Sequence, residues 1–516
     1  MNTLAVGYAI AATLFFLVIA KYDIHMFQLS SYRNNRYFRW LIPGNIISLK
    51  RLFAMLMLAA AFIPGYYGIA LAACITIASY VHCFREKFKT PLVYTMRVKR
   101  LFTTDIILFL AIAVPTLLFA GEWATVITGV ALALSNVIML LANIVNTPVE
   151  KGINRHYYND ARRIIESHKG LIIIGVTGSF GKTSTKNYLA GVLAEKYNVL
   201  VTPGNFNTLL GVIRTIREQL RPYHQVFIVE MGAKQKNDIK EICDLVHPTI
   251  GIVTAVGEMH LETFKSIENI QDTKFELINS LPANGLGIIN NDSKYINNYT
   301  GITSPCKILR YAVEADADYR ATNVQYGASG VSFTLNDGEA LNSRLLGAGN
   351  LLNILASIAV ADHLGVPVNR QRNAIARLQP VEHRLSMKVA NGITVLDDAY
   401  NSNPQGAKMA LEVLKNFAVG ESNRRIVITP GFVEMGARQY EANRELGRTI
   451  ATSCDYAIVV NATNREAIKE GIDEAGLATD RYYLADSLNN AHAHLAQILK
   501  VGDVVLYEND LPDNFK

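Results

Sequence analysis

The segment from Gly178 to Ser184 contains the residues of this chain whose types and spacing are best suited to chemistry. It has the sequence G-S-F-G-K-T-S, which combines glycines, hydroxyl side chains and Lys182. Backbone N–H groups of such a loop, and of a helix that begins at its end, can face phosphate groups. The lysine adds a fixed cation, and the hydroxyl after it can bind Mg²⁺. The segment therefore predicts a binding site for a nucleoside triphosphate, ATP or GTP.

The elements on either side of this loop are the ones that would hold it in place. Residues 171–176 are apolar and predict a buried strand, and a helix is expected from Lys182 to about Lys196. The usual pattern G-x-x-x-x-G-K-[ST] would place its first glycine at Val176, so the match is imperfect. An ordinary strand-turn-helix with an exposed lysine is the alternative interpretation.

The composition divides the 516 residues into a membrane-like part and a soluble part. Apolar runs dominate residues 1–148, where we predict a multi-span transmembrane domain of about five helices. The expected helices are at roughly 3–20, 50–64, 66–83, 103–120 and 124–145, each near the ~20 apolar residues that a span needs. The second of these is short and could instead form a re-entrant hairpin with the third.

Lysine and arginine predict the orientation of the membrane part. They are concentrated in segments 21–51 and 84–102, whereas the turns near 64–66 and 121–123 have none. Because basic loops stay in the cytoplasm, about five crossings would place the N-terminus outside. We therefore predict a multi-pass protein of the cell inner (cytoplasmic) membrane with its catalytic domains in the cytoplasm. The two basic segments account for the net charge of +6, so no nucleic-acid partner is expected.

Strands and helices alternate after residue 149, which is typical of a mostly parallel sheet. We predict a central ATP-binding α/β domain over 149–379 and a C-terminal Rossmann-like α/β domain over 380–516. Polar residues at the carboxyl ends of such strands line the ligand crevice. Glu230 follows one strand and is a candidate Mg²⁺ ligand, and His260 follows the next. A solvated glutamate and a packed histidine are the structural alternatives.

The C-terminal domain has two acids, Asp397 and Asp398, where a predicted strand ends before an Asn-rich turn. Carboxylates at this place suit contacts to a ribose or a metal. A tight turn capped by Asp and Asn explains the same residues equally well.

These motifs, taken in order, resemble the Mur ligase family, and most closely its D-alanyl-D-alanine-adding (MurF-like) branch. The resemblance covers about residues 150–510, and the loop has the family form T-G-[ST]-x-G-K-[ST]. The other matching motifs are 202–208, 230–232, 260–262 followed by Lys274, Asn350 with Asn353, 382–385 and 397–404.

The resemblance implies an ATP-dependent amide (peptide-bond) ligase, a C–N bond-forming enzyme that produces ADP. It would join an amino acid or dipeptide to a carboxylate of a cell-envelope precursor of the peptidoglycan type, as UDP-MurNAc-tripeptide–D-Ala-D-Ala ligases do. ATP would first convert the carboxylate to an acyl phosphate, which the amine then attacks. Since the carboxylate and the γ-phosphate repel each other, the site must supply positive charge and alignment. Two Mg²⁺ ions are expected.

The same resemblance assigns roles to individual residues. The catalytic residues would be Lys182, His260 and Lys274, the last as a carbamate whose negative charge can hold a metal. The metal ligands would be Thr183, Glu230, His260 and Lys274. The nucleotide contacts would be Thr177, Gly178, Ser179, Gly181, Lys182, Thr183, Ser184, Asn350, Asn353, Arg384 and Asp398. The contacts to the precursor and the amine would be Thr202, Asn205, Thr208, Tyr400, Asn401 and Asn403.

The chain departs from the family pattern in several places. Gly349 occupies a position where relatives have histidine, and segments 430–436 and 508–513 differ from family motifs in the domain that receives the amine. These last two departures put D-Ala-D-Ala in question as the co-substrate.

The membrane segment stands where a family member has a domain that binds the uridine nucleotide. We therefore hypothesise that the precursor is lipid-linked, or handed over at the membrane, rather than a free small-molecule UDP-sugar peptide. Two alternatives are a polyglutamate-type membrane ligase and an NTP-driven transporter component. Transport pathways usually need ionisable residues, and the predicted spans have almost none besides Asp105.

Overall fold

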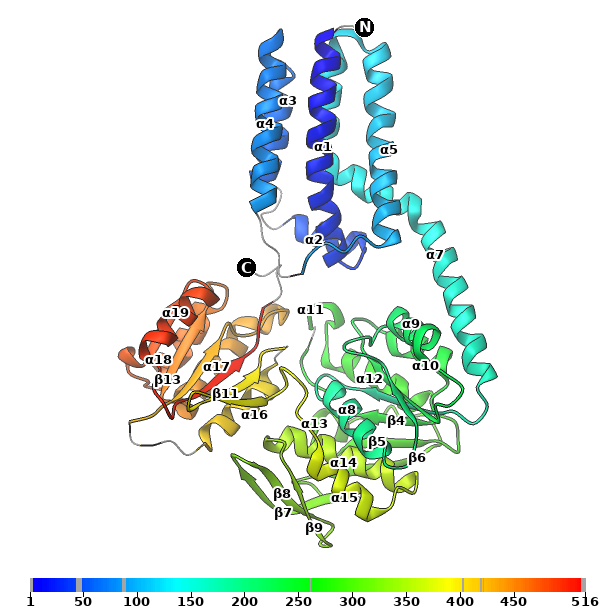
Figure 1. The fold of residues 1–516 in the computed structure, drawn as a ribbon, viewed down its shortest axis with the longest axis vertical. Helices are drawn as coiled ribbons and strands as arrows, with labels where there is room; N and C mark the ends of the chain where they lie inside the picture. The colour runs from blue at the N-terminus through cyan, green and yellow to red at the C-terminus, as the bar shows by residue number, and fades with distance from the viewer. Residues whose placement is uncertain are drawn as a thin grey trace. The chain divides into compact units, whose positions relative to one another are not determined.

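The computed structural model of the chain describes residues 3–42, 49–85, 90–259, 261–400, 403–417, 420 and 422–511. It divides into two compact units, Met1–His156 and Tyr157–Lys516. They are called the helical unit and the α/β unit below, and each is described by itself (Figure 1).

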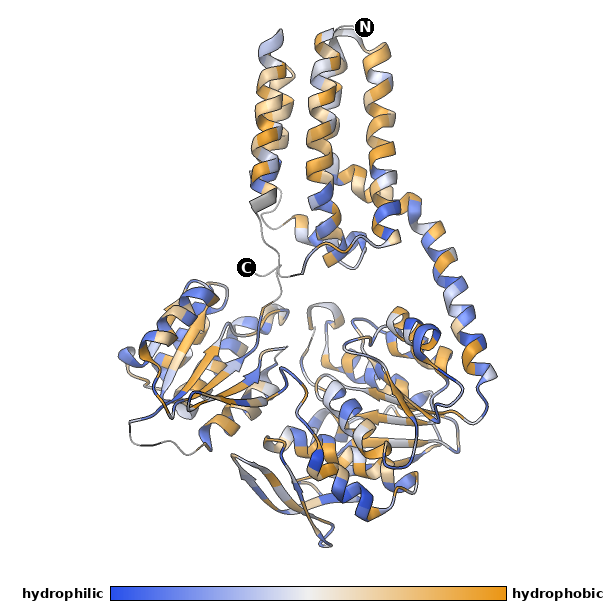
Figure 2. Ribbon diagram, in the orientation of Figure 1, coloured by the Kyte–Doolittle hydropathy of each residue, from blue (hydrophilic) through white to orange (hydrophobic). Residues whose placement is uncertain are grey.

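The helical unit consists of helices joined by short connections. Their bounds are α1 (Thr3–Leu29), α2 (Asn34–Leu41), α3 (Leu49–Ala60), α4 (Tyr66–Arg85), α5 (Met96–Phe119), η2 (Gly121–Trp123), α6 (Ala124–Ala133) and α7 (Ser135–Ser167). The part of α7 after His156 belongs to the α/β unit. Hydrophobic residues dominate α1, α4 and α5 along most of their length (Figure 2). Many large apolar side chains of this unit are exposed, among them Ile77 and Phe119. A helix with such a surface is typical of a membrane span.

The number of helices that could span a membrane is smaller than predicted. Within the described residues, α1, α4 and α5 are long and apolar enough, and the bent pair α6 and α7, which meet at 71°, could form a fourth span. Helix α3 has 12 residues, about 18 Å at 1.5 Å per residue, which is short of the ~30 Å hydrocarbon core. The predicted boundary at residue 148 also falls inside the continuous helix α7.

The first domain of the α/β unit is built on a nine-stranded sheet with the order β2-β3-β1-β4-β5-β6-β7-β8-β9. Strands β2 to β7 in this order are parallel, and β7, β8 and β9 are antiparallel. The strands are β1 (Ile172–Thr177), β2 (Val199–Val201), β3 (Val226–Met231), β4 (Ile250–Val253), β5 (Leu286–Asn290), β6 (Lys307–Ala312), β7 (Tyr319–Gly327), β8 (Gly330–Leu335) and β9 (Ala340–Ser343). The helices are α8 (Lys182–Leu193), α9 (Leu209–Gln219), α10 (Asp238–Val246), α11 (Leu261–Phe264), α12 (Ile267–Asn279), α13 (Lys294–Asn297), α14 (Gly347–His363) and α15 (Val368–Arg377).

The central strands of this sheet are buried on both faces, as the apolar runs predict. On β3, for example, Ile228 packs in one hydrophobic cluster, together with Leu189 of α8, and Val229 packs in another, together with Ile242 of α10. The polar positions at the carboxyl ends of β1, β3 and β4 are therefore held at one edge of a rigid sheet.

The second domain of the α/β unit has a six-stranded sheet with the order β10-β11-β15-β12-β13-β14, parallel except for β10 at its edge. Its strands are β10 (Ser386–Ala390), β11 (Ile393–Asp398), β12 (Arg425–Thr429), β13 (Tyr456–Val460), β14 (Tyr482–Ala485) and β15 (Val504–Glu508). Its helices are α16 (Pro404–Lys415), η3 (Gly436–Arg438), α17 (Gln439–Ser453), α18 (Arg465–Glu474), η4 (Thr479–Arg481) and α19 (Leu488–Ile498). The predicted fold class, apolar helices followed by two mostly parallel α/β domains, is confirmed.

Candidate active site

The phosphate-loop candidate connects the end of β1 to the start of α8, as predicted. Two of its glycines have backbone angles that favour glycine, with φ of +154° at Gly178 and +81° at Gly181. A Cβ atom at Gly178 would lie 2.1 Å from Thr254 Oγ1, and one at Gly181 would lie 2.8 Å from Asn353 Oδ1. The close packing of the loop against its neighbours therefore requires both glycines.

Lys182 is the first residue of α8, where the helix N–H groups lack partners within the helix. Its Nζ donates hydrogen bonds to the carbonyl oxygens of Gly178 (2.7 Å) and Ser179 (3.1 Å). Burial lowers the pKa of Lys182 to about 8, although the nearby Glu230 carboxylate opposes this shift. The structure thus places a cation and a helix N-terminus together, an arrangement that favours anions.

The side chains of Thr177 and Ser179 form hydrogen bonds with the backbone of neighbouring segments. Thr177 Oγ1 donates to the Met231 carbonyl (2.8 Å) and joins β1 to β3. Ser179 Oγ donates to the Gly257 carbonyl (3.1 Å) and accepts from the Gly257 N–H (3.0 Å). The Ser179 N–H also donates to the Ala255 carbonyl (2.7 Å). The structure thus gives both side chains a role in positioning the loop, and their predicted nucleotide contacts stay a prediction.

Glu230 lies at the end of β3, next to Val176 in the sheet register. It is 1% exposed, and its Oε1 accepts a hydrogen bond from Asn207 Nδ2 (3.0 Å). Its Oε2 is 3.0 Å from Lys186 Nζ but has no hydrogen-bond partner in the described part of the chain. Burial raises the pKa of Glu230, but Lys186 and Lys182 together outweigh burial and hold this pKa below its usual value. The carboxylate therefore stays ionised, with an oxygen atom able to accept a further contact.

Lys274 lies on α12 and is 4% exposed. Burial, followed by the positive charge of Lys182, lowers its pKa to about 7. A substantial share of this lysine is therefore uncharged at neutral pH, which is the form that can react as a nucleophile. Thr183 is partly exposed on the first turn of α8. His260 and Asn401, both predicted site residues, lie outside the described residues.

A cleft with a volume of about 770 Å³, counted out to its open mouth, is lined by residues of both α/β domains. From the first domain it includes the predicted residues Gly181, Ser184, Asn350 and Asn353. From the second domain it includes the predicted residues Arg384, Asp398 and Asn403. The structure thus brings together, around one open cleft, predicted residues that are far apart in the sequence.

The two asparagines of α14 are held against α8. Asn353 Oδ1 accepts from Thr185 Oγ1 (2.9 Å), and Asn350 Oδ1 accepts from Tyr188 Oη (2.9 Å). These bonds fix the asparagine rotamers and tie α14 to the helix that carries the phosphate loop.

The second domain contributes a cation and an acid to the cleft. The Arg384 guanidinium lies over the Tyr400 ring, 4.1 Å from its centroid. Asp398 Oδ1 accepts from the Leu385 N–H (3.0 Å), which joins the Arg384 segment to the end of β11. Burial raises the pKa of Asp398 to about 6, while the Arg384 charge opposes this rise. In such a pair, the carboxylate can accept hydrogen bonds from hydroxyl groups, and the arginine can bind phosphates.

Several predicted substrate residues have structural partners. Thr208 Oγ1 accepts from the Gly211 N–H (3.3 Å) and caps α9, and Asn403 Oδ1 caps α16 through the N–H groups of Gln405 and Gly406. Thr202 is fully buried, whereas Asn205 and Tyr400 are exposed. Capping accounts for the residue types at 208 and 403 without a substrate.

Three residues of the site, Thr254, Asn290 and Lys186, are not among the predicted site residues. Thr254 and Asn290 line the cleft from the ends of β4 and β5. Lys186 is fully buried one turn after Lys182. A lysine four residues after the loop lysine, on the same helix face, was the available signal for it.

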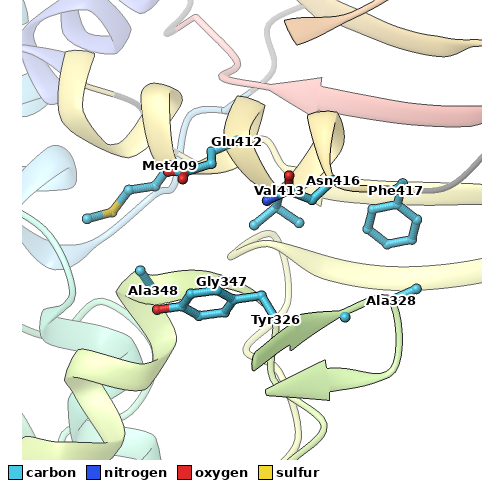
Figure 3. A pocket seen from close by; sticks show the side chains of 10 residues that line it. Tyr326, Ala328, Gly347, Ala348, Met409, Glu412, Val413, Asn416 and Phe417 are labelled. Atoms are coloured by element: carbon cyan, nitrogen blue, oxygen red, sulfur yellow. The ribbon is translucent and has the colours of Figure 1, made fainter. Parts of the chain in front are cut away.

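A smaller pocket of about 470 Å³ adjoins the cleft and shares Gly347 and Met409 with it. Figure 3 shows Met409 and Val413 of α16 on one side and the Tyr326 ring of β7 on the other.

Comparison with known proteins agrees with this geometry. Residues 176–361 match the Mur ligase middle domain, and residues 383–507 match the Mur ligase, glutamate ligase domain. The UDP-N-acetylmuramoyl-tripeptide–D-alanyl-D-alanine ligase of Mycobacterium bovis is 33% identical over 361 residues, which cover 65% of this chain and 70% of that protein. The chain belongs to the Mur ligase family. Within this Mur ligase, both matched regions lie in the α/β unit.

Two further comparisons place the α/β unit in this family. The Bacillus subtilis ligase of the same name is 28% identical over 284 residues, 55% of this chain. The chain spans 61% of the length of that relative. The crystal structure of the MurF ligase from Thermotoga maritima in complex with ADP matches with a TM-score of 0.61 and 26% identity, over 69% of this chain and 80% of that one. The shared Mur ligase fold is therefore the one built by β1 to β15.

Proposed function

We propose that this Mur ligase is an ATP-dependent amide ligase that adds an amino acid or dipeptide to a carboxylate of a peptidoglycan-type precursor at the cytoplasmic face of the membrane. The single observation that carries the proposal is the cleft, in which residues beside the phosphate loop of one domain and Arg384 and Asp398 of the other line the same space. The named activity of the Mycobacterium bovis relative supports the reaction type.

The residues of the first domain would bind and align the triphosphate. Lys182 and the N–H groups at the start of α8 would hold the β- and γ-phosphates, and Gly178 and Gly181 allow the loop to approach them closely. Asn353 would contact the base from α14. Fixed positive charge next to the γ-phosphate lowers its repulsion with the substrate carboxylate, which favours an acyl-phosphate intermediate.

The donor set fits Mg²⁺. Glu230 keeps an ionised, buried oxygen that forms an ion pair with Lys186 but has no hydrogen-bond partner in the described residues, and Thr183 has a hydroxyl next to Lys182. These two side chains would hold one ion, and Lys274, as a carbamate, would hold a second together with His260. When bound, Mg²⁺ neutralises phosphate charge. The low pKa of Lys274 supports the carbamate, because a neutral amine is the form that adds CO₂.

The second domain would complete the site by closing over the nucleotide. Arg384 and Asp398 would contact phosphate and ribose, and Tyr400 would lie toward the incoming amine. The apolar helices of the helical unit support a membrane location, and with it a precursor that is lipid-linked or delivered at the membrane.

The decisive experiment measures ADP release by the detergent-purified full-length chain. The panel combines carboxylate acceptors, both UDP-muramoyl peptides and their lipid-linked forms, with amines that include D-Ala-D-Ala, single amino acids and glutamate. ADP release that requires both an acceptor and an amine is the expected result. A preference for lipid-linked acceptors supports a precursor that is lipid-linked or delivered at the membrane. Equal use of the UDP-linked form contradicts this part of the proposal.

The same panel separates the alternatives. Repeated glutamate addition to one acceptor would indicate a polyglutamate-type ligase. ATP turnover independent of both acceptor and amine would contradict ligation and favour a transporter component.

A further inference from the structure

Lys186 is a fully buried lysine that the proposed reaction does not use. It lies on α8, one helical turn after Lys182, and is 1% exposed. Its Nζ donates to the carbonyl oxygens of Thr202 (2.8 Å) and Gly204 (2.8 Å). The same atom forms an ion pair with Glu230 Oε2 at 3.0 Å. Of the three N–H donors of an ammonium group, two thus bond carbonyl oxygens, and the charge is paired with the Glu230 carboxylate.

A buried ammonium group is retained only where its partners are fixed. Moving an unpaired charge out of water is unfavourable, so the stability of this site depends on the two carbonyl oxygens and the Glu230 carboxylate staying in place. Glu230 is itself held by Asn207 Nδ2 on its other oxygen. Lys186 therefore joins α8, the end of β3 and the segment 202–208, called the β2–α9 loop below, at a single point.

The β2–α9 loop depends on this point for its shape. Its first residue, Thr202, donates its N–H to the Ile228 carbonyl (3.1 Å), and its Oγ1 accepts from the Glu230 N–H (3.1 Å). Near its end, the Asn207 carbonyl accepts from the Gly232 N–H (2.7 Å). Between these ends, Lys186 binds the carbonyl groups of Thr202 and Gly204. The loop is thus anchored on two sides, and its tip at Gly204 and Asn205 is exposed.

We propose that Lys186 is a positioning residue that couples the phosphate loop to the β2–α9 loop, and that this coupling sets how well the carboxylate substrate binds. Lys182 and Lys186 are one turn apart on the same rigid helix, about 6 Å along its axis. A shift of the α8 N-terminus on triphosphate binding is therefore passed to the Thr202 and Gly204 carbonyls through the ammonium group. This inference rests on the proposed function and on the prediction that Thr202, Asn205 and Thr208 of the β2–α9 loop contact the substrates.

The chain offers a matched control for a lysine that only holds backbone together. Lys196 Nζ also donates to two carbonyl oxygens, those of Leu364 (2.9 Å) and Gly365 (2.9 Å). Lys196 follows α8, and both of its bonds are exposed. The variants K186M and K196M each remove an ammonium group and two lysine–carbonyl hydrogen bonds. K186M acts on the β2–α9 loop and also removes the ion pair with Glu230, whereas K196M does neither.

The first measurement is hydrogen–deuterium exchange over 203–208 in the full-length chain, with and without a non-hydrolysable ATP analogue and Mg²⁺. The analogue is expected to slow exchange of this loop in the wild type and in K196M. In K186M the loop is expected to exchange faster than in the wild type, and the analogue should not slow it. Equal protection in K186M and the wild type would overturn the coupling. This readout does not depend on catalysis, so it stays valid if no acceptor is ligated and the proposed function fails.

The second measurement is steady-state kinetics with the acceptor and amine identified by the ADP-release panel. K186M is expected to raise KM for the carboxylate acceptor about tenfold or more while changing KM for ATP less than about threefold, since a tenfold change corresponds to about 1.4 kcal/mol. Equal losses for acceptor and ATP, together with a lower melting temperature, would indicate a merely structural lysine and contradict the proposal.

A second variant keeps the proposal testable if K186M does not fold. N207A removes the other hydrogen bond to Glu230 and leaves the ion pair with Lys186 intact. Its loop 203–208 is expected to exchange faster than in the wild type and still to be slowed by the analogue, because Lys186 carries the coupling. Loss of the analogue effect in N207A would contradict that assignment.

Discussion

Both units of the molecule bury a pair of opposite charges, but in different surroundings. In the α/β unit, Lys186 and Glu230 are 3.0 Å apart, with side chains 1% and 2% exposed, at a sheet edge beside the phosphate loop. In the helical unit, Arg51 Nη2 is 2.6 Å from Asp23 Oδ1, with side chains 8% and 1% exposed. Arg51 Nη1 also donates to Ser135 Oγ (2.9 Å), so the pair joins α3, α1 and the start of α7.

The difference between the pairs shows two uses of buried charge. The carbonyls around Lys186 belong to a loop, and Glu230 keeps an oxygen without a hydrogen bond in the described residues, which suits ligand binding. The partners of Arg51 are side chains of neighbouring helices, which suits helix packing. Charge changes in the α/β unit should therefore alter activity first, and charge changes in the helical unit should alter stability first.

The largest effect is expected from R51M in the helical unit. Removing one partner of a buried ion pair leaves the other charge uncompensated and costs roughly 3–5 kcal/mol. The apparent melting temperature of the detergent-purified chain should fall, and the double variant D23N/R51M should recover part of the loss. An unchanged melting temperature in R51M would contradict a stabilising role for the Arg51–Asp23 pair.

K182M tests whether a charge change in the α/β unit alters activity before stability. Loss of a fixed charge next to the reacting phosphate is expected to reduce kcat by about 10²–10³-fold. The melting temperature should change little, because within the described residues the lysine donates to carbonyls of its own loop. The check is ADP release together with a melting curve. Activity within a few-fold of the wild type would exclude Lys182 from catalysis.

D398N should separate binding from stability. It is expected to raise KM for ATP about tenfold or more, because hydrogen bonds to charged groups contribute roughly 1.5–3 kcal/mol.

Burial raises the pKa of Asp398 to about 6, so the folded state binds a proton more readily than the unfolded state. The ionised carboxylate therefore destabilises the fold fully above pH 6, and this cost fades as the pH falls through 6 toward the unfolded pKa of ~3.9.

The melting temperature of D398N should consequently exceed that of the wild type at pH 8, and the gap should narrow at pH 5. The amide oxygen can still accept from the Leu385 N–H, which keeps the local structure. A lower melting temperature at pH 8 would show that the carboxylate stabilises the fold.

The smallest effect is expected from S179A. Its side chain exchanges two hydrogen bonds with the backbone of Gly257, so the variant should lose about 1 kcal/mol of stability. KM for ATP should change less than about threefold, a factor below the ~1.4 kcal/mol of a tenfold change. A large rise in KM for ATP would support the predicted nucleotide contact of Ser179 and contradict a purely positional role.

The parts of the site that follow from local pattern were predicted well. An apolar run that ends in G-S-F-G-K-T predicted both β1 and the start of α8, and acids at strand ends predicted Glu230 and Asp398 at the edges of two sheets. These positions depend on strand periodicity and on the backbone freedom of glycine, which are properties of neighbouring residues. The predictions for Thr208 and Asn403 missed their capping roles, because Thr and Asn serve caps and ligands with the same atoms.

The amino-acid sequence by itself determined the family, the two α/β domains, the apolar helices and the loop that would bind phosphate. Only the tertiary structure decided that Lys186 meets Glu230, that two asparagines of α14 are tied to α8, and that Arg384 and Asp398 share a cleft with the first domain. For the Lys186–Glu230 pair the physical reason is the sheet order β2-β3-β1, and for the other contacts it is the packing of helices and domains against each other. The sheet order brings the ends of strands that are distant in the chain side by side, and no local pattern specifies which side chains then share a buried charge.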